Sequence, residues 1–186
     1  MRDDGPRWDE RYRAATTVDP HRPEALDRWP EAASLLPTVG RCLDLASGPG
    51  STALWAAERG LTVTAVDAST VAIELLRTAA VDLGRGDNID ARVVDLDHGI
   101  PSDIVDSDLI VCQRFRDPEL TTTMIDRLRV GGYAIVTVLS TVGAPLPGEF
   151  HAPPGALRDE FAADERCEIV HHDEGDGVAH IVVRRC

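Results

Sequence analysis

The sequence contains no lysine, because all 19 of its basic residues are arginine. This absence excludes several enzyme classes whose chemistry depends on a lysine side chain. A Walker P-loop needs a lysine that reaches the nucleotide phosphates, and a protein kinase needs one on a strand beside the nucleotide. A pyridoxal phosphate enzyme needs a lysine for its Schiff base. The Tyr-x-x-x-Lys pair of short-chain dehydrogenases is equally impossible here.

Excess basic charge and long apolar runs are missing as well. Asp and Glu total 32 against 19 basic residues, which gives a net charge of −13. Nucleic-acid-binding proteins normally carry a basic footprint, so neither nucleic acid nor an anionic membrane surface is an expected partner. No apolar run approaches the ~20 residues of a membrane span, and the polar N-terminal sequence has no signal-peptide core. We expect a cytoplasmic protein, a monomer or homodimer, with a small-molecule substrate.

Cysteine is sparse and scattered. The four cysteines form no C-x-x-C pair, so the ligand spacing of a zinc site is absent and no metal is expected. Cys42 and Cys112 lie inside apolar runs, which predicts buried free thiols. Cys186 is terminal and is expected to be exposed.

Strand and helix patterns alternate along most of the chain. Residues 1–37, rich in Arg, Pro and Trp, are predicted to form an N-terminal helical cap segment, and residues 38–186 the main domain, within a single domain overall. The length of 186 residues fits one domain of ~100–200 residues. Strand patterns occur at residues 41–46, 61–66, 91–94, 108–112 and 133–139, with a late pair at 167–171 and 178–183.

This alternation predicts an α/β fold: a doubly wound, mostly parallel, Rossmann-like sheet with helices on both faces. The late pair is joined by a short DEGDG turn and adds a C-terminal antiparallel hairpin, which brings the sheet to seven strands. Ser69 is a predicted helix N-cap, and Pro118 is expected in a first helical turn. Gly131 and Gly132 are predicted to turn the chain into the fifth strand.

A glycine-rich turn follows the first strand, in the sequence LDLASGPG from Leu43 to Gly50. Gly48 and Gly50 allow a ligand to approach the backbone closely, and the helix that follows begins with free N–H groups. With Ala53, the turn also matches the G-x-G-x-x-[GA] pattern of dinucleotide-binding proteins. The turn alone therefore leaves the ligand open.

Acidic residues at three strand ends distinguish between the possible ligands. Asp44, inside the first strand, disfavours a pyrophosphate and suits a ligand with a positive amino group. Asp67 ends the second strand, where a carboxylate can accept both ribose hydroxyls. Asp95 ends the third strand, in position for an adenine amino group, although Asp97 is a close competitor. The alternative role for Asp44 and Asp95 is in turns or caps. Together the three acids fit S-adenosylmethionine (SAM), which has an ammonium, a ribose and an adenine but no phosphate.

The stretch LDLASGPGSTALWAAERGLTVTAVDAS resembles motif I and the following acidic strand of class I SAM-dependent methyltransferases. Many of these proteins have glycine where this sequence has Ala46. Alanine is tolerated there if its φ is negative. Trp8, Arg11 and Tyr12 form a W-x-x-R-Y motif that resembles the tellurite-resistance-type and thiopurine-methyltransferase-like branch, as do Arg114-Phe115 and the stretch from Pro147 to Leu157. The likeness covers nearly the whole chain, and Arg116-Asp117 makes its substrate side unusually charged.

The resemblance implies a methyl transfer from SAM, with S-adenosylhomocysteine as product, to a thiol, a metalloid or a hydroxyl acceptor. Trp8 and Tyr12 would cover the cofactor as a lid or, alternatively, belong to a docked amphipathic helix. Arg114 and Phe115 would contact the substrate, and Glu149 and His151 are catalytic candidates, with a surface-loop role as the alternative for His151. The residues expected to bind the cofactor are Trp8, Tyr12, Asp44, Ala46, Ser47, Gly48, Gly50, Asp67, Ala68, Asp95, Leu96 and Gln113.

No convincing general base stands out in the sequence. His171 and His172 are neighbours on a strand, so they point to opposite faces and cannot join one site. A hydroxyl acceptor would need a base within hydrogen-bond reach, so the lack of one favours a thiol, thiolate or metalloid. Two other functions stay open: a SAM-binding protein that catalyses nothing and a nucleotide-dependent oxidoreductase.

Overall fold

The computed structural model describes residues 5–15 and 17–186. The chain divides into two compact units, one of residues 1–22 and 37–105 and the other of residues 23–36 and 106–186. Each unit contains strands flanked by helices. The predicted cap segment contributes helix α1 to the first unit and two short helices to the second.

The first unit is a three-stranded parallel sheet with helices. Its strands run in the order β3-β2-β1, and the register pairs Arg41 with Thr62 and Val63 with Ile89. Each strand is followed by a helical segment, which is the pattern that a parallel sheet requires. Its elements are α1 (Gly5–Tyr12), β1 (Arg41–Leu45), α3 (Ser51–Glu58), β2 (Thr62–Asp67), α4 (Thr70–Asp82), η2 (Gly86–Asn88), β3 (Ile89–Val93) and η3 (Leu96–His98).

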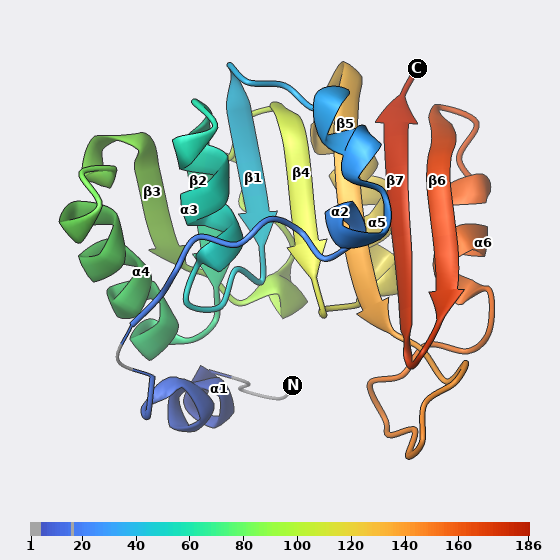
Figure 1. The fold of residues 1–186 in the computed structure, drawn as a ribbon, viewed down its shortest axis with the longest axis horizontal. Coiled ribbons are helices and arrows are strands. Elements are labelled where there is room, and N and C mark those ends of the chain that lie inside the picture. The colour runs from blue at the N-terminus through green and yellow to red at the C-terminus, as the bar shows by residue number, and fades with distance from the viewer. Residues whose placement is uncertain (1–4, 16) are drawn as a thin grey trace. The chain divides into compact units, whose positions relative to one another are not determined.

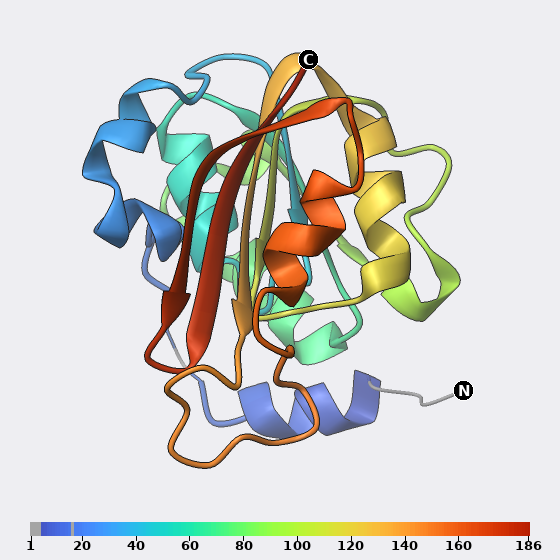
Figure 2. The same ribbon diagram turned by 90° about the vertical axis from the view of Figure 1, so that its right-hand side faces the viewer.

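The second unit has four strands in the order β4-β5-β7-β6. β4 and β5 are parallel, whereas β7 pairs antiparallel with both β5 and β6. Helix α2 packs on β5 and β7 from one face, and α5 and α6 pack on the other face of the same strands (Figures 1 and 2). Its elements are α2 (Ala25–Arg28), η1 (Pro30–Ser34), β4 (Ser107–Gln113), α5 (Pro118–Arg127), β5 (Leu128–Leu139), α6 (Ala156–Ala162), β6 (Cys167–Gly175) and β7 (Val178–Arg185).

These elements confirm the predicted fold class: seven strands, mostly parallel, in a Rossmann-like arrangement that ends in an antiparallel hairpin. The hairpin turns at Asp176 and Gly177, both with positive φ (53° and 82°), as a two-residue turn between twisted strands needs. The predicted cap at Ser69 is confirmed, since its side chain accepts a hydrogen bond from the N–H of Ala72. Cys42 and Cys112 are buried free thiols and Cys186 is exposed, also as predicted.

One local prediction is wrong. Gly131 and Gly132 do not separate the fifth strand from a preceding turn, because β5 already begins at Leu128. The pairing with β4 instead jumps from Ser107–Leu128 to Leu109–Tyr133, so the additional residues of β5 form an irregularity within the strand. A bulge of this kind lets a strand continue while part of it loses its partner. Within the described residues, no helix is long and apolar enough to cross a membrane.

Candidate active site

Asp44 lies in β1 with its side chain inside the first unit. It is 1% exposed, and its carboxylate accepts a hydrogen bond from the N–H of Ala53 in the first turn of α3. Its Oδ2 is buried without a hydrogen-bond partner in the described part of the chain. Burial, together with the negative charge of Asp67, raises the pKa of Asp44 to about 8. A buried acid with an orphaned oxygen is the site's most unusual feature.

Asp67, at the end of β2, ties the glycine-rich turn to the start of α4. Its Oδ2 accepts from the N–H of Gly48 and its Oδ1 from the N–H of Ser69, both at 2.8 Å. Burial raises the pKa of this carboxyl, although the two backbone hydrogen bonds act in the opposite direction. The side chain is only 8% exposed. Both oxygens are therefore fixed in position by backbone groups.

The turn from Ala46 to Gly50 has three residues with left-handed backbone conformations. Gly48 has φ 52° and Gly50 has φ 92°. A Cβ on Gly50 would lie 2.3 Å from a Leu76 methyl group, so this glycine also allows α4 to pack closely. Ser47 holds the turn to β2, since its N–H donates to the carbonyl of Val66 at 3.0 Å.

The condition of a negative φ at Ala46 is not met, because the structure has φ 50° there. The chain leaves β1 in a left-handed conformation before the two glycines, which is why related proteins can use glycine at this position. A side chain in this region costs roughly 1–2 kcal/mol. The stable neighbouring contacts of Ser47 and Gly48 hold the residue in this conformation.

Helix α1 carries Trp8 and Tyr12, whose rings stack with centroids 6.0 Å apart. The hydroxyl of Tyr12 lies against the glycine turn, as a Cβ built on Gly48 would be 2.9 Å from it. Burial and the nearby charge of Asp67 raise the pKa of Tyr12. Tyr12 thus covers the turn from the side of α1, while Trp8 contacts the side chain of Arg11.

Asp9, between these two aromatic residues, fastens α1 to the start of α4. Its Oδ1 accepts from the hydroxyl of Ser69 at 2.6 Å and from the N–H of Val71 at 3.1 Å. The hydrogen bond from Ser69, followed by that from Val71, lowers the pKa of Asp9. Sequence analysis missed Asp9. Its position within the W-x-x-R-Y motif was the available signal.

Asp95 acts as a cap in the structure. Its side chain accepts from the N–H of Asp97 at 3.0 Å at the start of η3, and its Oδ2 lies 3.5 Å from Nδ1 of His98. Leu96, which follows it, is buried. Ala68 lies between Asp67 and the Ser69 cap and is partly exposed. The structure therefore brings Asp44, Asp67, Tyr12 and the glycine turn together, and gives Asp95 a local structural role.

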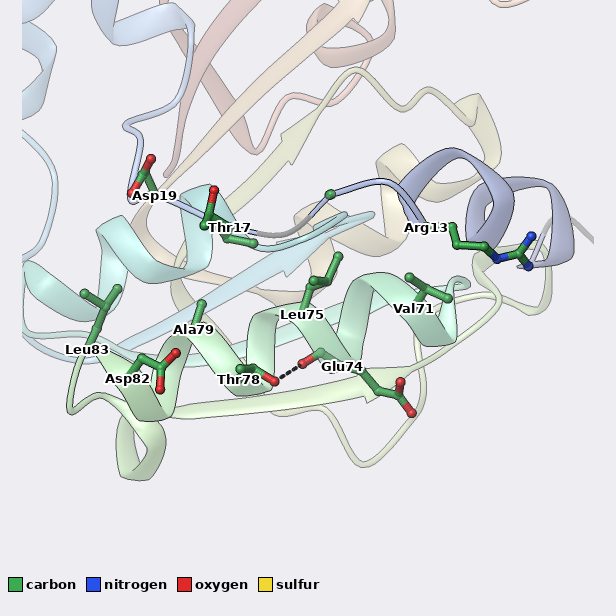
Figure 3. Close-up of a pocket in the computed structure, with 12 residues that line it drawn as sticks. Arg13, Thr17, Asp19, Val71, Glu74, Leu75, Thr78, Ala79, Asp82 and Leu83 are labelled. Carbon is green, nitrogen blue, oxygen red and sulfur yellow. Dashed lines mark hydrogen bonds between the residues drawn. The ribbon is translucent and has the colours of Figure 1, made fainter.

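A separate pocket of about 490 Å³ lies between α4 and the segment that follows α1 (Figure 3). Its walls mix charged and apolar side chains, and Thr78 donates to the Glu74 carbonyl within α4. None of the predicted site residues lines it. The lining residues are Arg13, Ala15, Thr17, Val18, Asp19, Val71, Glu74, Leu75, Thr78, Ala79, Asp82 and Leu83.

In the second unit, the end of β4 is bound to the segment before α2. The backbone N–H of Glu24 donates to Oε1 of Gln113 at 3.0 Å, and Nε of Arg114 donates to Oε1 of Glu24 at 2.6 Å. Arg114 has φ 58° and its side chain is 59% exposed. The predicted substrate arginine is thus paired with a carboxylate that the sequence analysis did not consider.

The remaining candidates of this unit lie in loops. Phe115 is half-buried, and its carbonyl faces the Cys112 thiol at 3.6 Å. Nδ1 of His151 accepts from the N–H of Gly148 at 2.9 Å, within the loop itself. Glu149 is exposed in the same loop. Among the described residues, no group of three or more His, Cys, Asp or Glu side chains could hold a metal ion.

A buried pair that sequence analysis missed lies in the strands of the same unit. The hydroxyl of Thr137 in β5 and Nδ1 of His180 in β7 are 3.0 Å apart. Thr137 is fully buried and His180 is 5% exposed. The pair depends on the antiparallel register of β5 and β7, which the sequence does not specify.

Residues 42–132 match the model of a family described as a methyltransferase domain. This segment contains Asp44, the glycine turn and Asp67. Over these residues the chain is similar to methyltransferase domains. No curated protein sequence matches the chain.

Solved structures support the fold over almost the whole chain. TehB from Haemophilus influenzae is 20% identical with a TM-score of 0.73, covering 98% of this chain and 67% of that one. A SAM-dependent methyltransferase from Mesorhizobium loti is 19% identical with a TM-score of 0.67, covering 85% and 97%. Geranyl diphosphate C-methyltransferase from Streptomyces coelicolor A3(2), in complex with Mg²⁺, geranyl diphosphate and S-adenosylhomocysteine, is 13% identical with a TM-score of 0.70, covering 99% and 97%.

Proposed function

We propose that this chain transfers the methyl group of SAM to a small-molecule acceptor, and that residues around the ends of β1 and β2 hold the cofactor. The observation that carries this proposal is the orphaned, buried Oδ2 of Asp44. A buried polar atom without a partner is costly, and a ligand that supplies the missing hydrogen bond removes that cost. The ammonium group of SAM offers the positive donor that this oxygen lacks.

Asp67 fits the ribose. Each carboxylate oxygen has two lone pairs, and each oxygen of Asp67 uses one of them for a backbone N–H, from Gly48 or from Ser69. One lone pair per oxygen is left for the two ribose hydroxyls. The backbone hydrogen bonds hold the carboxylate in place before the cofactor arrives.

Other residues of the proposed cofactor site have supporting roles. Tyr12 and Trp8 form a cover on the glycine turn that Asp9 fastens to α4. Asp95 and Leu96 follow β3, where an adenine would meet the sheet edge, and Gln113 ends β4. The full proposed set is Trp8, Tyr12, Asp44, Ala46, Ser47, Gly48, Gly50, Asp67, Ala68, Asp95, Leu96 and Gln113.

When bound, SAM supplies a methyl group on a positively charged sulfur, which is a reactive electrophile. The protein's residues have to align the acceptor with that group and exclude water from the site. We propose that Arg114 and Phe115 contact the acceptor, with Glu149 and His151 as loop residues near it. The acceptor is a thiol, a metalloid or a hydroxyl, and we place the chain in the tellurite-resistance-type and thiopurine-methyltransferase-like branch that its motifs resemble.

Calorimetry tests the cofactor assignment directly. SAM or S-adenosylhomocysteine should bind with a micromolar dissociation constant, and NADH should give no heat of binding. Binding of NADH without binding of SAM would overturn the proposal in favour of an oxidoreductase. Turnover assays with thiols, phenols, amines and metalloids then separate an enzyme from a protein that binds SAM and methylates none of them.

A further inference from the structure

A row of four polar side chains crosses the strands of the second unit. Gln113 of β4 is paired with Thr137 of β5, Thr137 with His180 of β7, and His180 with Asp173 of β6. Residues directly opposite each other on neighbouring strands project to the same face of a sheet. All four side chains therefore share one face, which is the face covered by α2 (Figure 1).

The row lies at an edge where ligands bind in parallel sheets. Gln113 is the last residue of β4, and Thr137 is two residues from the end of β5. In open α/β sheets, ligands occupy the space beyond the carboxyl ends of the parallel strands. His180 reaches this edge because β7 runs antiparallel and begins there, at Val178.

Charged side chains surround His180 from the other elements of the unit. Glu24 and Arg28 face it from the segment of α2, Asp173 from β6 and Arg114 from the end of β4. Both carboxylates have an arginine partner: Arg28 donates to Asp173 at 2.8 Å through Nε, and Arg114 to Glu24 at 2.6 Å. Within the described residues, His180 has only the Thr137 hydroxyl as a hydrogen-bond partner.

The electrostatic balance keeps the His180 ring neutral. Burial is the largest influence and lowers its pKa below 6.5. Glu24 and Asp173 raise this pKa, whereas Arg28 and Arg114 lower it, and the pKa is lowered overall. A neutral imidazole near pH 7 has one nitrogen with a free lone pair and can accept a proton.

We propose that His180 is the general base of this methyltransferase and takes the proton from a hydroxyl acceptor bound beyond the ends of β4 and β5. The inference rests on the proposed function, since it names the acceptor class of the same reaction. It also revises the preference for a thiol or metalloid that the sequence suggested.

Thr137 acts as a positioning residue in this proposal. The contact of 3.0 Å between the Thr137 hydroxyl and Nδ1 of His180 serves, in this proposal, to hold the tautomer in which Nδ1 carries the proton and donates it to the hydroxyl, so that the lone pair is on Nε2. In the proton transfer, the O–H bond of the acceptor breaks, the proton joins Nε2, and the electron pair remains on the oxygen. That oxygen then bonds the methyl carbon while the bond from this carbon to the sulfonium sulfur breaks, and the electron pair of that bond stays on the sulfur of S-adenosylhomocysteine. The imidazolium returns its proton to water after the product leaves.

The acceptor class follows from the need for a base. A thiolate or a metalloid oxyanion already carries its nucleophilic electron pair, so a buried neutral histidine adds nothing to its reaction. A hydroxyl with a pKa far above the working pH needs a base within hydrogen-bond reach, and a positioned base contributes about 10²- to 10⁴-fold in rate.

The test compares two probe acceptors, catechol and thiophenol, the latter at a pH where it is already a thiolate. In His180→Gln, catechol methylation should fall by about 10²- to 10⁴-fold, while thiophenol methylation should stay nearly unchanged. Calorimetry should give the same SAM dissociation constant as for the unsubstituted protein. His172→Gln is the matched control, because His172 pairs with Ile181 and projects to the opposite face.

Two further readouts separate catalysis from packing. NMR titration of the unsubstituted protein should assign His180 a pKa below the ordinary 6.5, and addition of catechol should shift its ring resonances. The rate of catechol methylation should fall at acid pH with the same midpoint, and Thr137→Val should move that midpoint.

The outcomes decide between the two proposals. An unchanged catechol rate in His180→Gln, or equal losses with both probes, overturns His180 as the base. Methylation of thiophenol but never of catechol by the unsubstituted protein also overturns it and leaves methyl transfer intact. Absence of SAM binding would overturn the proposed function itself.

Discussion

The carboxylates beside the glycine turn of the first unit and those around His180 in the second unit are held in different ways. In the first unit, Asp44 and Asp67 are buried and accept hydrogen bonds from backbone N–H groups. In the second unit, Glu24 and Asp173 are bound by arginine side chains whose exposed fractions are 59% and 46%. Backbone donors belong to the fold and cannot move away, whereas arginines can exchange partners. The carboxylates held by backbone N–H groups therefore suit one fixed ligand. The carboxylates held by arginine side chains suit an acceptor that enters and leaves.

The largest effect is expected at the glycine turn of the first unit. In Gly50→Ala, the new Cβ would lie 2.3 Å from Leu76 at a φ of 92°. Overpacking costs typically about 1–3 kcal/mol, and a left-handed alanine roughly 1–2 kcal/mol. We expect a loss of about 2–5 kcal/mol in the free energy of unfolding, measured by urea denaturation.

Gly84→Ala is the matched control for this substitution. Gly84 has φ 66°, but a Cβ there meets nothing within 4 Å. The free energy of unfolding of this variant should fall only by the roughly 1–2 kcal/mol that a left-handed backbone conformation costs an alanine. Equal losses in both variants would mean that contact with Leu76 contributes nothing to the rigidity of the turn.

Asp67→Ala removes the carboxylate that the backbone holds in place for the ribose. Hydrogen bonds to a charged group contribute about 1.5–3 kcal/mol each, so SAM affinity should fall roughly tenfold to a thousandfold. Calorimetry measures the dissociation constant, and circular dichroism checks that the fold is retained. Glu58→Ala, at an exposed residue that ends α3, should bind SAM normally, and normal binding by Asp67→Ala would reduce Asp67 to a turn residue.

The pH dependence of stability tests the burial of Asp44. Its pKa is about 8 when folded, against 3.8 as the ordinary value. Between these values the folded state holds more protons than the unfolded state, so the contribution of Asp44 to stability falls as the pH rises. Asp44→Asn cannot ionise and should gain thermal stability over the unsubstituted protein through this window, by about 2–4 °C per kcal/mol.

The same variant should bind SAM about tenfold more weakly or worse, because an amide cannot lose a proton and become the carboxylate that would accept a hydrogen bond from the ammonium group of SAM. Asp87→Asn, at an exposed residue of η2, should keep a melting curve parallel to that of the unsubstituted protein at every pH. If Asp44→Asn behaved in the same way, Asp44 would not be a protonated buried acid.

What the sequence predicted well depends on short-range patterns. The strand–turn–helix around Gly48 and the Ser69 cap are each set by residues within one turn, and local spacing identifies them. The contact of Asp9 with Ser69 joins residues 60 positions apart. The Thr137–His180 pair depends on an antiparallel register over 43 positions. Neither of these two contacts produces a periodic pattern in the sequence. They can therefore be recognised only in the folded chain.

Arg114→Ala tests whether the arginines that hold the carboxylates of the second unit can exchange partners. Exposed ion pairs contribute about 0–1 kcal/mol, so loss of the Arg114–Glu24 pair should barely change the melting temperature or SAM affinity. If Arg114 binds the acceptor, the KM for the acceptor should rise. Arg129→Ala is the control, since it removes a similarly exposed pair with Asp108. A large loss of stability in Arg114→Ala would contradict the view that these arginines can exchange partners.

The smallest effect is expected at Ala46, the one residue of the first unit's turn whose side chain opposes its backbone conformation. Ala46 has φ 50°, and glycine would relieve roughly 1–2 kcal/mol of conformational cost while adding about 0.5–1 kcal/mol of unfolded-state entropy. Ala46→Gly should therefore gain about 0.5 kcal/mol, measured as the midpoint of urea unfolding. Ala68→Gly is the control, because Ala68 is not among the positive-φ residues of the described chain. Glycine there adds only unfolded-state entropy, so this variant should lose stability. Equal losses of unfolding free energy in both variants would show that the backbone at Ala46 is not strained, and that the glycine turn of the first unit holds no conformational strain at this residue.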